Sequence, residues 1–220
     1  MKLSIIVPVY NMAADGKLEY CLDSLVNQTI SDYEIIAVDD CSTDNSWDIL
    51  QSYAEKYPDK FHNIHSEVNK KQGGAKNIGM GLARGEWIGF IDSDDWITPD
   101  FYERLIRKGE ETGADMVGCD YHLTGEHSMK IGQVVPNNKP EQTGVLTREK
   151  YRSLILDSGS LVVKVYRREI VIDHKSRFPE GIFYEDNALA NSWMLRAHHF
   201  EYIPEPLYYY YQHDTSTVHT

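Results

Sequence analysis

Apolar and polar positions follow two different periods along the first half of the chain. Short apolar runs predict strands, near residues 3–9, 33–38, 61–66, 86–91 and 115–121. Apolar residues at helical spacing predict helices between them, near residues 17–28, 44–56, 73–83 and 99–111. Strands that alternate with helices form βαβ units with right-handed crossovers. We therefore predict an α/β fold with a mainly parallel central sheet flanked by helices.

The second half is less regular. Residues 125–140 are rich in Gly, Asn, Pro and Lys, which predicts a long surface loop or a loose hairpin. Further along, the pattern predicts a short helix over 147–157, a strand over 161–166, a helix that includes 188–195 and a strand over the tyrosines 208–211. Four tyrosines in a strand put two on each face, so we expect two in the core and two available to stack on a ligand. We expect residues 1–220 to form one domain.

Carboxylates stand at the ends of predicted strands. The apolar run before residue 92 ends in Asp92, Asp94 and Asp95. Residues i and i+2 of an extended chain point to the same side, so Asp92 and Asp94 can converge on one ligand. Two such oxygen donors suit Mg²⁺ or Mn²⁺, which would hold the phosphates of a nucleotide. The alternative is an Asx-type turn formed by Asp92, Ser93 and Asp95 before a helix.

Ligands of open parallel sheets collect at the carboxyl ends of the strands. Three segments are predicted to meet there, namely Pro8–Tyr10, Asp39–Asp40 and Asp92–Asp95. The Gly-rich stretch 73–86 does not satisfy the GxGxxG spacing and precedes a strand, which excludes a dinucleotide fingerprint.

Composition narrows the class of partner. The chain has 220 residues, with 22 Lys and Arg against 34 Asp and Glu and a formal charge of −12, which argues against a nucleic-acid partner. No apolar run approaches the roughly 18–20 residues of a membrane helix, and the N-terminus reads as a strand and not as a signal peptide. The cysteines Cys21, Cys41 and Cys119 lack CxxC spacing, which favours reduced thiols in a cytoplasm over zinc.

Four motifs in register carry a family resemblance. The stretches V-P-V-Y-N, V-D-D-x-S-T-D, A-[RK]-N-x-G and F-x-D-S-D-D resemble the N-terminal half of family 2 glycosyltransferases and cover nearly all of residues 1–105. Residues 177–188 resemble the family's F-x-E-G-x-x-x-E-D segment, and 164–168 and 206–216 resemble two further segments. Val163 and Gln212 replace an asparagine and a frequent arginine of the family, so the roles of those residues are not carried over.

The resemblance implies a GT-A fold, Rossmann-like, with a smaller acceptor-side C-terminal portion. Residues 1–105 would bind the nucleotide sugar, and residues 106–220 would hold the acceptor and the catalytic base. The implied reaction is inverting transfer of a sugar from a UDP-linked donor, with Mn²⁺ or Mg²⁺, to a hydroxyl of a saccharide or lipid-linked acceptor in surface polysaccharide or glycolipid synthesis. It implies a cytoplasmic location, with peripheral association at the inner membrane face as an option, and leaves a homo-oligomer open.

The resemblance also implies roles for individual residues. Asp94 would be the main metal ligand, with Asp92 on the metal or the ribose, and His213 could complete the site as in some GT-A enzymes. A solvent-exposed or core histidine is the alternative for His213. Asp39 would recognise a uracil N–H, while Asp40 is a less certain neighbour that could be a turn or helix cap. The nucleotide slot would be lined by Pro8, Val9, Tyr10 and Ser93.

Three residues farther along complete the predicted site. Lys76 would balance diphosphate charge, against the alternative of a solvated helix surface, and Asn77 would bind a polar partner nearby. Asp186 would be the general base, and Glu185 would face inward or brace the loop. The alternative is that both acids only begin a helix, where they offset its dipole.

Two other functional classes remain open. One is a nucleotide-sugar-binding domain without activity. The other is a magnesium-dependent phosphatase with an aspartyl nucleophile, although its DxD normally follows the first strand of the core and here it follows the fourth.

Overall fold

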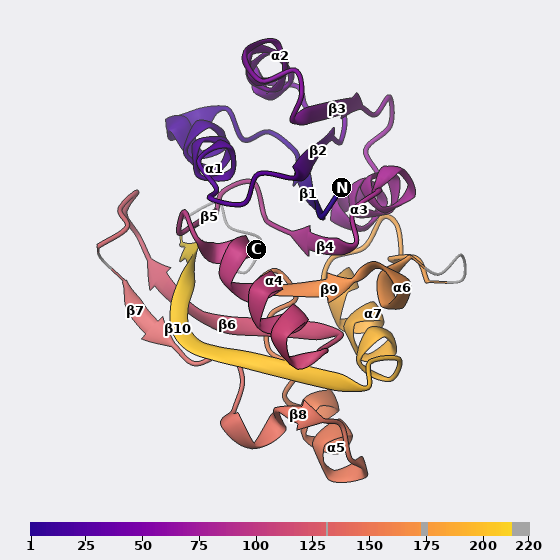
Figure 1. Ribbon diagram of the computed structural model, residues 1–220. Helices are drawn as coiled ribbons and strands as arrows, with labels where there is room; N and C mark the ends of the chain where they lie inside the picture. Colours follow the sequence, from indigo (N-terminus) through magenta and orange to yellow (C-terminus); the bar gives the residue numbers. More distant parts are fainter. Residues whose placement is uncertain (131, 173–175, 213–220) are drawn as a thin grey trace.

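The computed structural model describes residues 1–130, 132–172 and 176–212 of the chain. One sheet of ten strands runs through it, in the order β3-β2-β1-β4-β9-β6-β10-β5, with β7 paired to β6 and β8 to β10 (Figure 1). The strands are β1 (Leu3–Val9), β2 (Tyr33–Asp39), β3 (Phe61–His65), β4 (Trp87–Phe90), β5 (Trp96–Ile97), β6 (Met116–Thr124), β7 (Gln133–Val135), β8 (Gly144–Val145), β9 (Lys164–Arg167) and β10 (His199–Tyr211).

The N-terminal half is the parallel sheet that the sequence predicts. Strands β1, β2, β3 and β4 pair only in parallel with one another, with Val9 of β1 opposite Asp39 of β2. Every residue of β1 and β2 is buried, as expected for strands covered on both faces. The register brings the ends of β1 and β2 level, so the loops that follow them lie side by side.

Helices cover both halves of the sheet. They are α1 (Lys17–Val26), α2 (Ser46–Lys56), α3 (Lys71–Leu82), α4 (Phe101–Thr112), α5 (Arg148–Leu156), α6 (Arg168–Val171) and α7 (Glu185–Met194), with 3₁₀ turns η1 (Ala14–Gly16) and η2 (Pro140–Gln142). Helix α3 packs on β1 and β2, α4 packs on β6, β9 and β10, and α7 contacts α3 and α5. Figure 1 shows α4 in front of the sheet and α5 at its lower end.

The second half turns the sheet from parallel to mixed. Strand β9 pairs antiparallel with both β4 and β6, and thus joins the two halves, while β6 and β10 are parallel. Within 125–140, where the sequence predicts a long loop or a loose hairpin, the structure has the short strand β7, which pairs antiparallel with β6 before this range. The strand predicted over 208–211 is much longer and begins at His199, with bulges around Pro206. The strand predicted from residue 161 begins at Lys164.

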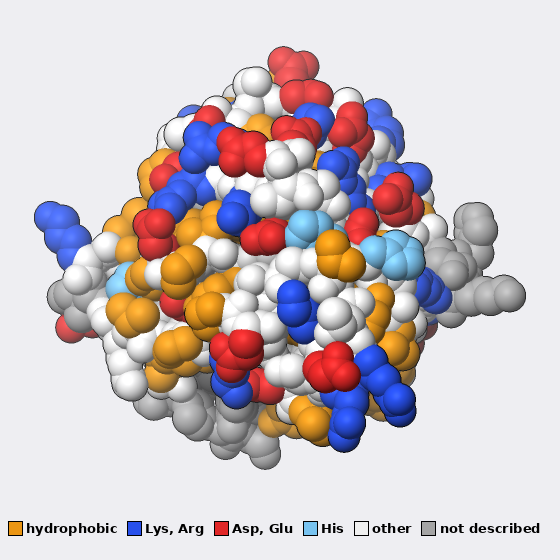
Figure 2. Space-filling model, turned by 60° about the horizontal axis from the view of Figure 1, so that its bottom comes forward, with side chains coloured by type: hydrophobic (Ala, Val, Ile, Leu, Met, Phe, Trp, Pro, Cys, Tyr) orange, Lys and Arg blue, Asp and Glu red, His pale blue; other side chains and the backbone are white. Residues whose placement is uncertain are grey.

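The surface carries charges of both signs. Figure 2 shows Lys and Arg side chains interleaved with Asp and Glu on the face that comes forward there. Within the described ranges, none of the helices has the length and apolar character needed to span a bilayer.

Candidate active site

The carboxyl ends of β1, β2 and β4 open into one cavity of about 530 Å³. Its wall includes the segments after these strands, the first turn of α3 and the start of α7. The lining residues are Pro8, Val9, Tyr10, Asn11, Met12, Lys17, Asp40, Asn69, Lys71, Gln72, Ala75, Lys76, Asp92, Ser93, Asp94, Asp95, Ser160, Leu161, Val162, Ile182, Phe183, Tyr184, Glu185, Asp186 and Tyr210. Residues of all four motifs within 1–105, and of the segment that contains Asp186, therefore line the same cavity.

The turn after β4 presents the DxD carboxylates to this cavity. Asp92 and Asp94 line it, and the backbone N–H of Asp95 donates to the carbonyl of Asp92 at 3.1 Å, which closes the turn. Asp95 is buried and accepts bonds from the Tyr208 hydroxyl at 2.5 Å and the Tyr211 N–H at 2.8 Å. Strand β10 thus holds the turn through Asp95, while Asp92 and Asp94 line the cavity.

The chemistry around Asp92 fits a divalent cation. Its Oδ1 atom is buried without a hydrogen-bond partner, although buried carboxylate oxygens are normally paired. Burial, together with the nearby carboxylates of Asp94, Glu185 and Asp186, raises the pKa of Asp92 to about 6 against the opposing charge of Lys76. A bound cation would supply the missing positive charge.

The described side chains alone do not complete a metal site. Among the residues that the structure describes, no group of three or more His, Cys, Asp or Glu side chains lies close enough to hold a metal. Mg²⁺ is usually bound by one or two carboxylates together with substrate phosphates, which matches a pair of aspartates. The predicted ligand His213 lies outside the described residues.

Asp39 and Asp40, the two carboxylates at the end of β2 and the candidates for recognition of the nucleotide base, have different surroundings. Asp39 is fully buried and does not line the cavity; its Oδ2 atom lies 2.7 Å from His65 Nδ1 and accepts from the Ser42 N–H. Asp40 lies in the cavity wall, where both its oxygens accept from the Lys70 N–H. Asp40 is therefore the carboxylate of this pair that lies in the cavity wall, whereas Asp39 lies behind it with its Oδ1 atom buried and without a hydrogen-bond partner. Recognition of the nucleotide base by Asp39 stays a prediction.

Lys76 forms a buried ion pair that the sequence did not predict, and its predicted role toward a diphosphate stays a prediction. Its ammonium forms an ion pair of 2.8 Å with Glu185, and both side chains are almost fully buried. It still lines the cavity, so the helix-surface alternative is wrong. Glu185 faces inward, as expected. The pair joins α3 to the start of α7 at the point where Asp186 follows.

Asn77 has the polar partner expected of it, but away from the cavity wall. Its Nδ2 donates to the Phe178 carbonyl at 2.9 Å, and its Oδ1 accepts from the Phe178 N–H at 2.8 Å. Phe178 is buried, with its ring centroid 5.9 Å from Phe90 and 5.5 Å from Trp193. Asn77 thereby fixes the backbone of the segment that leads to Asp186 and is not placed to contact a nucleotide.

Unusual backbone conformations gather at the cavity. Among non-glycine residues with positive φ, Asn11, Lys71 and Tyr184 line it, and Cys41 follows Asp40 directly. Such conformations cost free energy and cluster at functional sites. Asn11 is held there because its side chain accepts from the Thr43 N–H at 2.8 Å. Sequence gives no local signal for these positions.

The sequence predicted some residues of the cavity wall in part and others not at all. Tyr210 alone of the four consecutive tyrosines lines the cavity, while Tyr208 binds Asp95 and Tyr209 stacks on Trp96 at 5.6 Å. Residues Ser160–Val162 and Ile182–Tyr184 also form wall. These residues reach the cavity through contacts between distant parts of the chain, and neither segment contains a motif that predicts those contacts.

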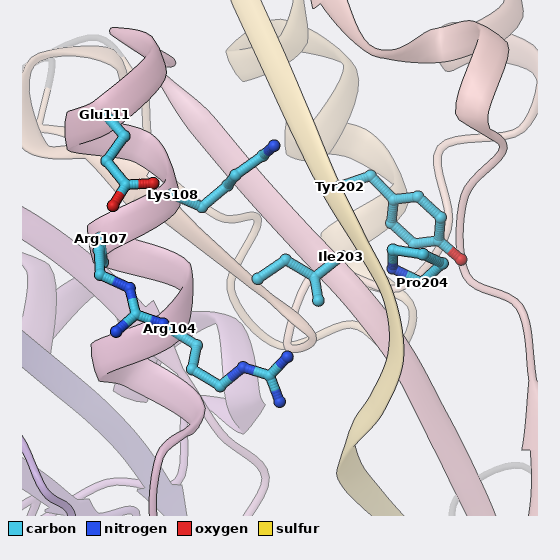
Figure 3. A pocket seen from close by; sticks show the side chains of 7 residues that line it. All are labelled: Arg104, Arg107, Lys108, Glu111, Tyr202, Ile203 and Pro204. Carbon is cyan, nitrogen blue, oxygen red and sulfur yellow. The ribbon is translucent and has the colours of Figure 1, made fainter.

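A second, smaller hollow of about 250 Å³ lies between α4 and β10 (Figure 3). Two of its three basic side chains have acidic partners: Arg104 pairs with Glu205, and Lys108 with Glu201. The hollow contains none of the residues that carry the predicted chemistry. We therefore assign the site to the larger cavity.

The chain is similar in sequence to known proteins. The family model described as "Glycosyl transferase family 2" matches residues 4–174. Putative glycosyltransferase EpsH of Bacillus subtilis is 37% identical over 227 residues, which cover 98% of this chain and 62% of EpsH. The chain spans about three fifths of the length of the first curated relatives that it matches.

Solved structures show the same fold. S. aureus TarS 1–349 in complex with UDP-GlcNAc superposes with a TM-score of 0.81 at 27% identity, over 98% of this chain and 60% of that one. Mannosyltransferase PcManGT from Pyrobaculum calidifontis, in complex with GDP-Man and Mn²⁺, has a TM-score of 0.71 at 18% identity, over 98% and 58% of the two chains. The predicted α/β, GT-A-type fold is confirmed.

Proposed function

The chain belongs to glycosyl transferase family 2, and on that premise we propose that it transfers a sugar from a UDP-linked donor to an acceptor hydroxyl with inversion. The observation that carries the proposal is the convergence of Asp40, the DxD pair and Asp186 on one cavity. The proposed acceptor is a saccharide or a lipid-linked sugar, as in surface polysaccharide or glycolipid synthesis. The UDP-GlcNAc complex of TarS supports a uracil nucleotide.

The donor would occupy the half of the cavity built by residues 1–105. Pro8, Val9 and Tyr10 would flank the base, and Asp40 would accept its N–H. Asp92 and Asp94 would hold Mn²⁺ or Mg²⁺, and Ser93 lies between them in the same wall. When bound, the cation neutralises charge that develops on the leaving diphosphate.

The acceptor side would supply the proton transfer. Asp186 lines the cavity in the first turn of α7, and we assign it as the base that takes the proton of the acceptor hydroxyl. The acceptor oxygen then attacks the anomeric carbon of the donor sugar. The bond between this carbon and the diphosphate breaks on the opposite face, which inverts the configuration at the carbon. Lys76 and Glu185 are positioning residues, because their ion pair fixes the start of α7.

A nucleotide panel tests the donor half of the proposal. A ligand that binds only the native state raises its apparent stability by mass action. We expect UDP to raise the melting temperature more with Mn²⁺ or Mg²⁺ than with EDTA, and UDP-sugars to release UDP slowly by hydrolysis. Equal shifts with and without metal would contradict the assignment of the DxD pair.

The alternatives have less support. Family membership and the position of the DxD after β4 argue against an aspartyl-nucleophile phosphatase. A domain that binds nucleotide sugar without turnover would not need Asp186 in the cavity wall. Such a domain would bind the UDP-sugar without hydrolysing it, so release of UDP from the donor would exclude this alternative.

A further inference from the structure

Three consecutive apolar side chains stand exposed just before Glu185 and the proposed catalytic base Asp186. Ile182, Phe183 and Tyr184 are 47%, 55% and 59% exposed, and all three line the cavity. Large apolar side chains at the surface are common one at a time, but a contiguous exposed group beside a site marks a binding surface. The donor roles proposed above use none of the three.

The fold holds this segment in place. The Gly181 N–H donates to the Lys70 carbonyl at 2.9 Å, and Lys70 pairs with Glu180 at 3.4 Å. The Lys71 ammonium lies 4.5 Å from the centre of the Phe183 ring. Tyr184 has a φ of 60°, which is unfavourable for an aromatic residue and is retained only where surrounding contacts impose it. The exposed side chains are therefore presented by an anchored loop.

The surroundings select the kind of ligand. Polar groups of Gln72 and Ser160 line the same cavity as the apolar side chains. A flat aromatic face combined with hydrogen-bonding groups suits a pyranose ring, which has an apolar face of C–H groups and a rim of hydroxyls. The position next to Asp186 places such a ring where its hydroxyl can meet the base.

We propose that Phe183 and Tyr184, with Ile182 beside them, form a stacking platform for a pyranose ring of the saccharide acceptor. This inference rests on the proposed transferase function and deepens it, because it assigns the acceptor half of the cavity. An aromatic face and the carboxylate of Asp186 in the wall of the same cavity would orient one ring hydroxyl toward the base. Phe183 is the stronger test, because its side chain offers only the ring.

Saturation-transfer NMR on the protein with UDP and Mg²⁺ tests the platform. The probes are methyl glycosides of glucose, galactose, mannose and N-acetylglucosamine. We expect at least one to bind, with Phe183→Ala weakening it by about tenfold and Phe183→Trp retaining it. Leu156→Ala, at an 85% exposed apolar residue of α5 away from the cavity lining, is the matched control and should bind like wild type.

The outcomes separate the two proposals. If UDP raises the melting temperature but no glycoside binds, or Phe183→Ala binds as well as wild type, the platform is overturned and the donor assignment stands. If octyl glycosides lose affinity in Phe183→Ala while methyl glycosides do not, the segment binds an alkyl chain and the platform is likewise overturned. If UDP itself fails to bind with metal, the proposed function fails and the platform fails with it.

Discussion

Two adjacent carboxylates at the end of β2 have different surroundings. Asp39 is buried against His65, whereas Asp40 faces the cavity. Alternation along a strand predicts that neighbours diverge, but it does not say which one faces the ligand. The sequence prediction of Asp39 followed the family motif, and only the tertiary position of Lys70 and the cavity distinguishes the two.

The base-recognition role makes a prediction about Asp40. Asp40→Asn should weaken UDP and uridine alike by about tenfold to a hundredfold, because a hydrogen bond to a charged acceptor is lost. Titration calorimetry with both ligands measures this. Asp39→Asn should lower the melting temperature but change the uridine affinity little. If the two variants show the reverse, Asp39 is the base-recognising residue.

The DxD turn makes a second prediction at this scale. Asp94→Asn keeps the shape of the side chain and removes its charge, so it should abolish the metal-dependent part of UDP binding. Thermal shifts with Mn²⁺ and with EDTA measure that part, and the exposed Asp59→Asn is the matched control. A wild-type metal response in Asp94→Asn would reduce Asp94 to a turn residue.

Glu185 and Asp186 are also adjacent, and we expect Asp186 to transfer the proton and Glu185 to stabilise the fold. Asp186→Asn should lower transfer by about two to four orders of magnitude while UDP still binds with metal, because only proton transfer is lost. Glu185→Gln leaves the Lys76 ammonium buried without its ionic partner, so it should lower the melting temperature as well. Retained turnover in Asp186→Asn together with an inactive, stable Glu185→Gln would reverse the assignment.

At the scale of elements, α3 acts as the support for the segment that carries the base. Asn77 holds the backbone of Phe178, and Lys76 pairs with Glu185. Gly73 packs closely against Phe178, Pro179 and Glu185. A Cβ on Gly73 would clash with the Pro179 carbonyl and lie 3.1 Å from Glu185 Cγ. The glycine is therefore needed for close approach and not for an unusual φ.

Gly73→Ala should displace this segment and reduce turnover more than UDP affinity. The control lies in the same helix: a Cβ on Gly81 would meet nothing within 4 Å. Gly81→Ala should be active and more stable by about 0.5–1 kcal/mol, because alanine favours helix. Chemical denaturation and UDP-release assays on both variants measure these effects. Equal activity in the two variants would contradict the supporting role of α3.

The elements predicted from sequence are those with local signals. Strands β1, β2 and β4 are short apolar runs, and each begins or ends close to its predicted limits. Strand β10 was recognised only at its tyrosines, because Pro204 and Pro206 interrupt the strand signal over residues 199–207. Its bulges there accommodate the prolines, which is a property of pairing with β6 and not of the segment itself.

At the scale of the whole molecule, the site depends on contacts between distant parts of the chain. Lys76 and Glu185 are separated by 109 positions, and Asp95 and Tyr208 by 113. Motifs identified the carboxylates because the chemistry needs those residue types at fixed spacing. The partner of Lys76 could not be predicted, because a buried ion pair is set by packing of α3 against α7.

One part of the cavity wall, residues Ser160 to Val162, depends on the buried side chain of Lys164. Lys164 on β9 is almost fully buried, and its Nζ donates to the carbonyls of Ser158 and Ser160 at 2.8 and 2.7 Å. These bonds fold residues 158–162 so that Ser160, Leu161 and Val162 reach the cavity. Burial lowers the pKa of Lys164 to about 7. A neutral amine still has two N–H groups, enough for both carbonyls.

The pKa of Lys164 predicts how the stability of the whole fold changes with pH. A lysine in the unfolded chain titrates near pH 10.4, so between about pH 7 and 10 the unfolded state binds one more proton than the folded state. The contribution of Lys164 to the free energy of unfolding therefore rises with pH across this range, by up to about 4 kcal/mol in total. Below about pH 7 both states are protonated, and the contribution is constant.

Lys164→Met isolates this contribution, since the substitution removes the titrating group and retains the apolar stem. The variant loses two hydrogen bonds at every pH, but it also avoids burying a charge. Its stability relative to wild type should therefore be most favourable at about pH 7 and below, and should decline steadily toward pH 9. Urea denaturation of both proteins at matched pH values measures the difference, in which the titration of buried cysteines and tyrosines cancels. A difference that does not change with pH would mean that Lys164 stays charged in the folded protein, held by the carbonyls of Ser158 and Ser160.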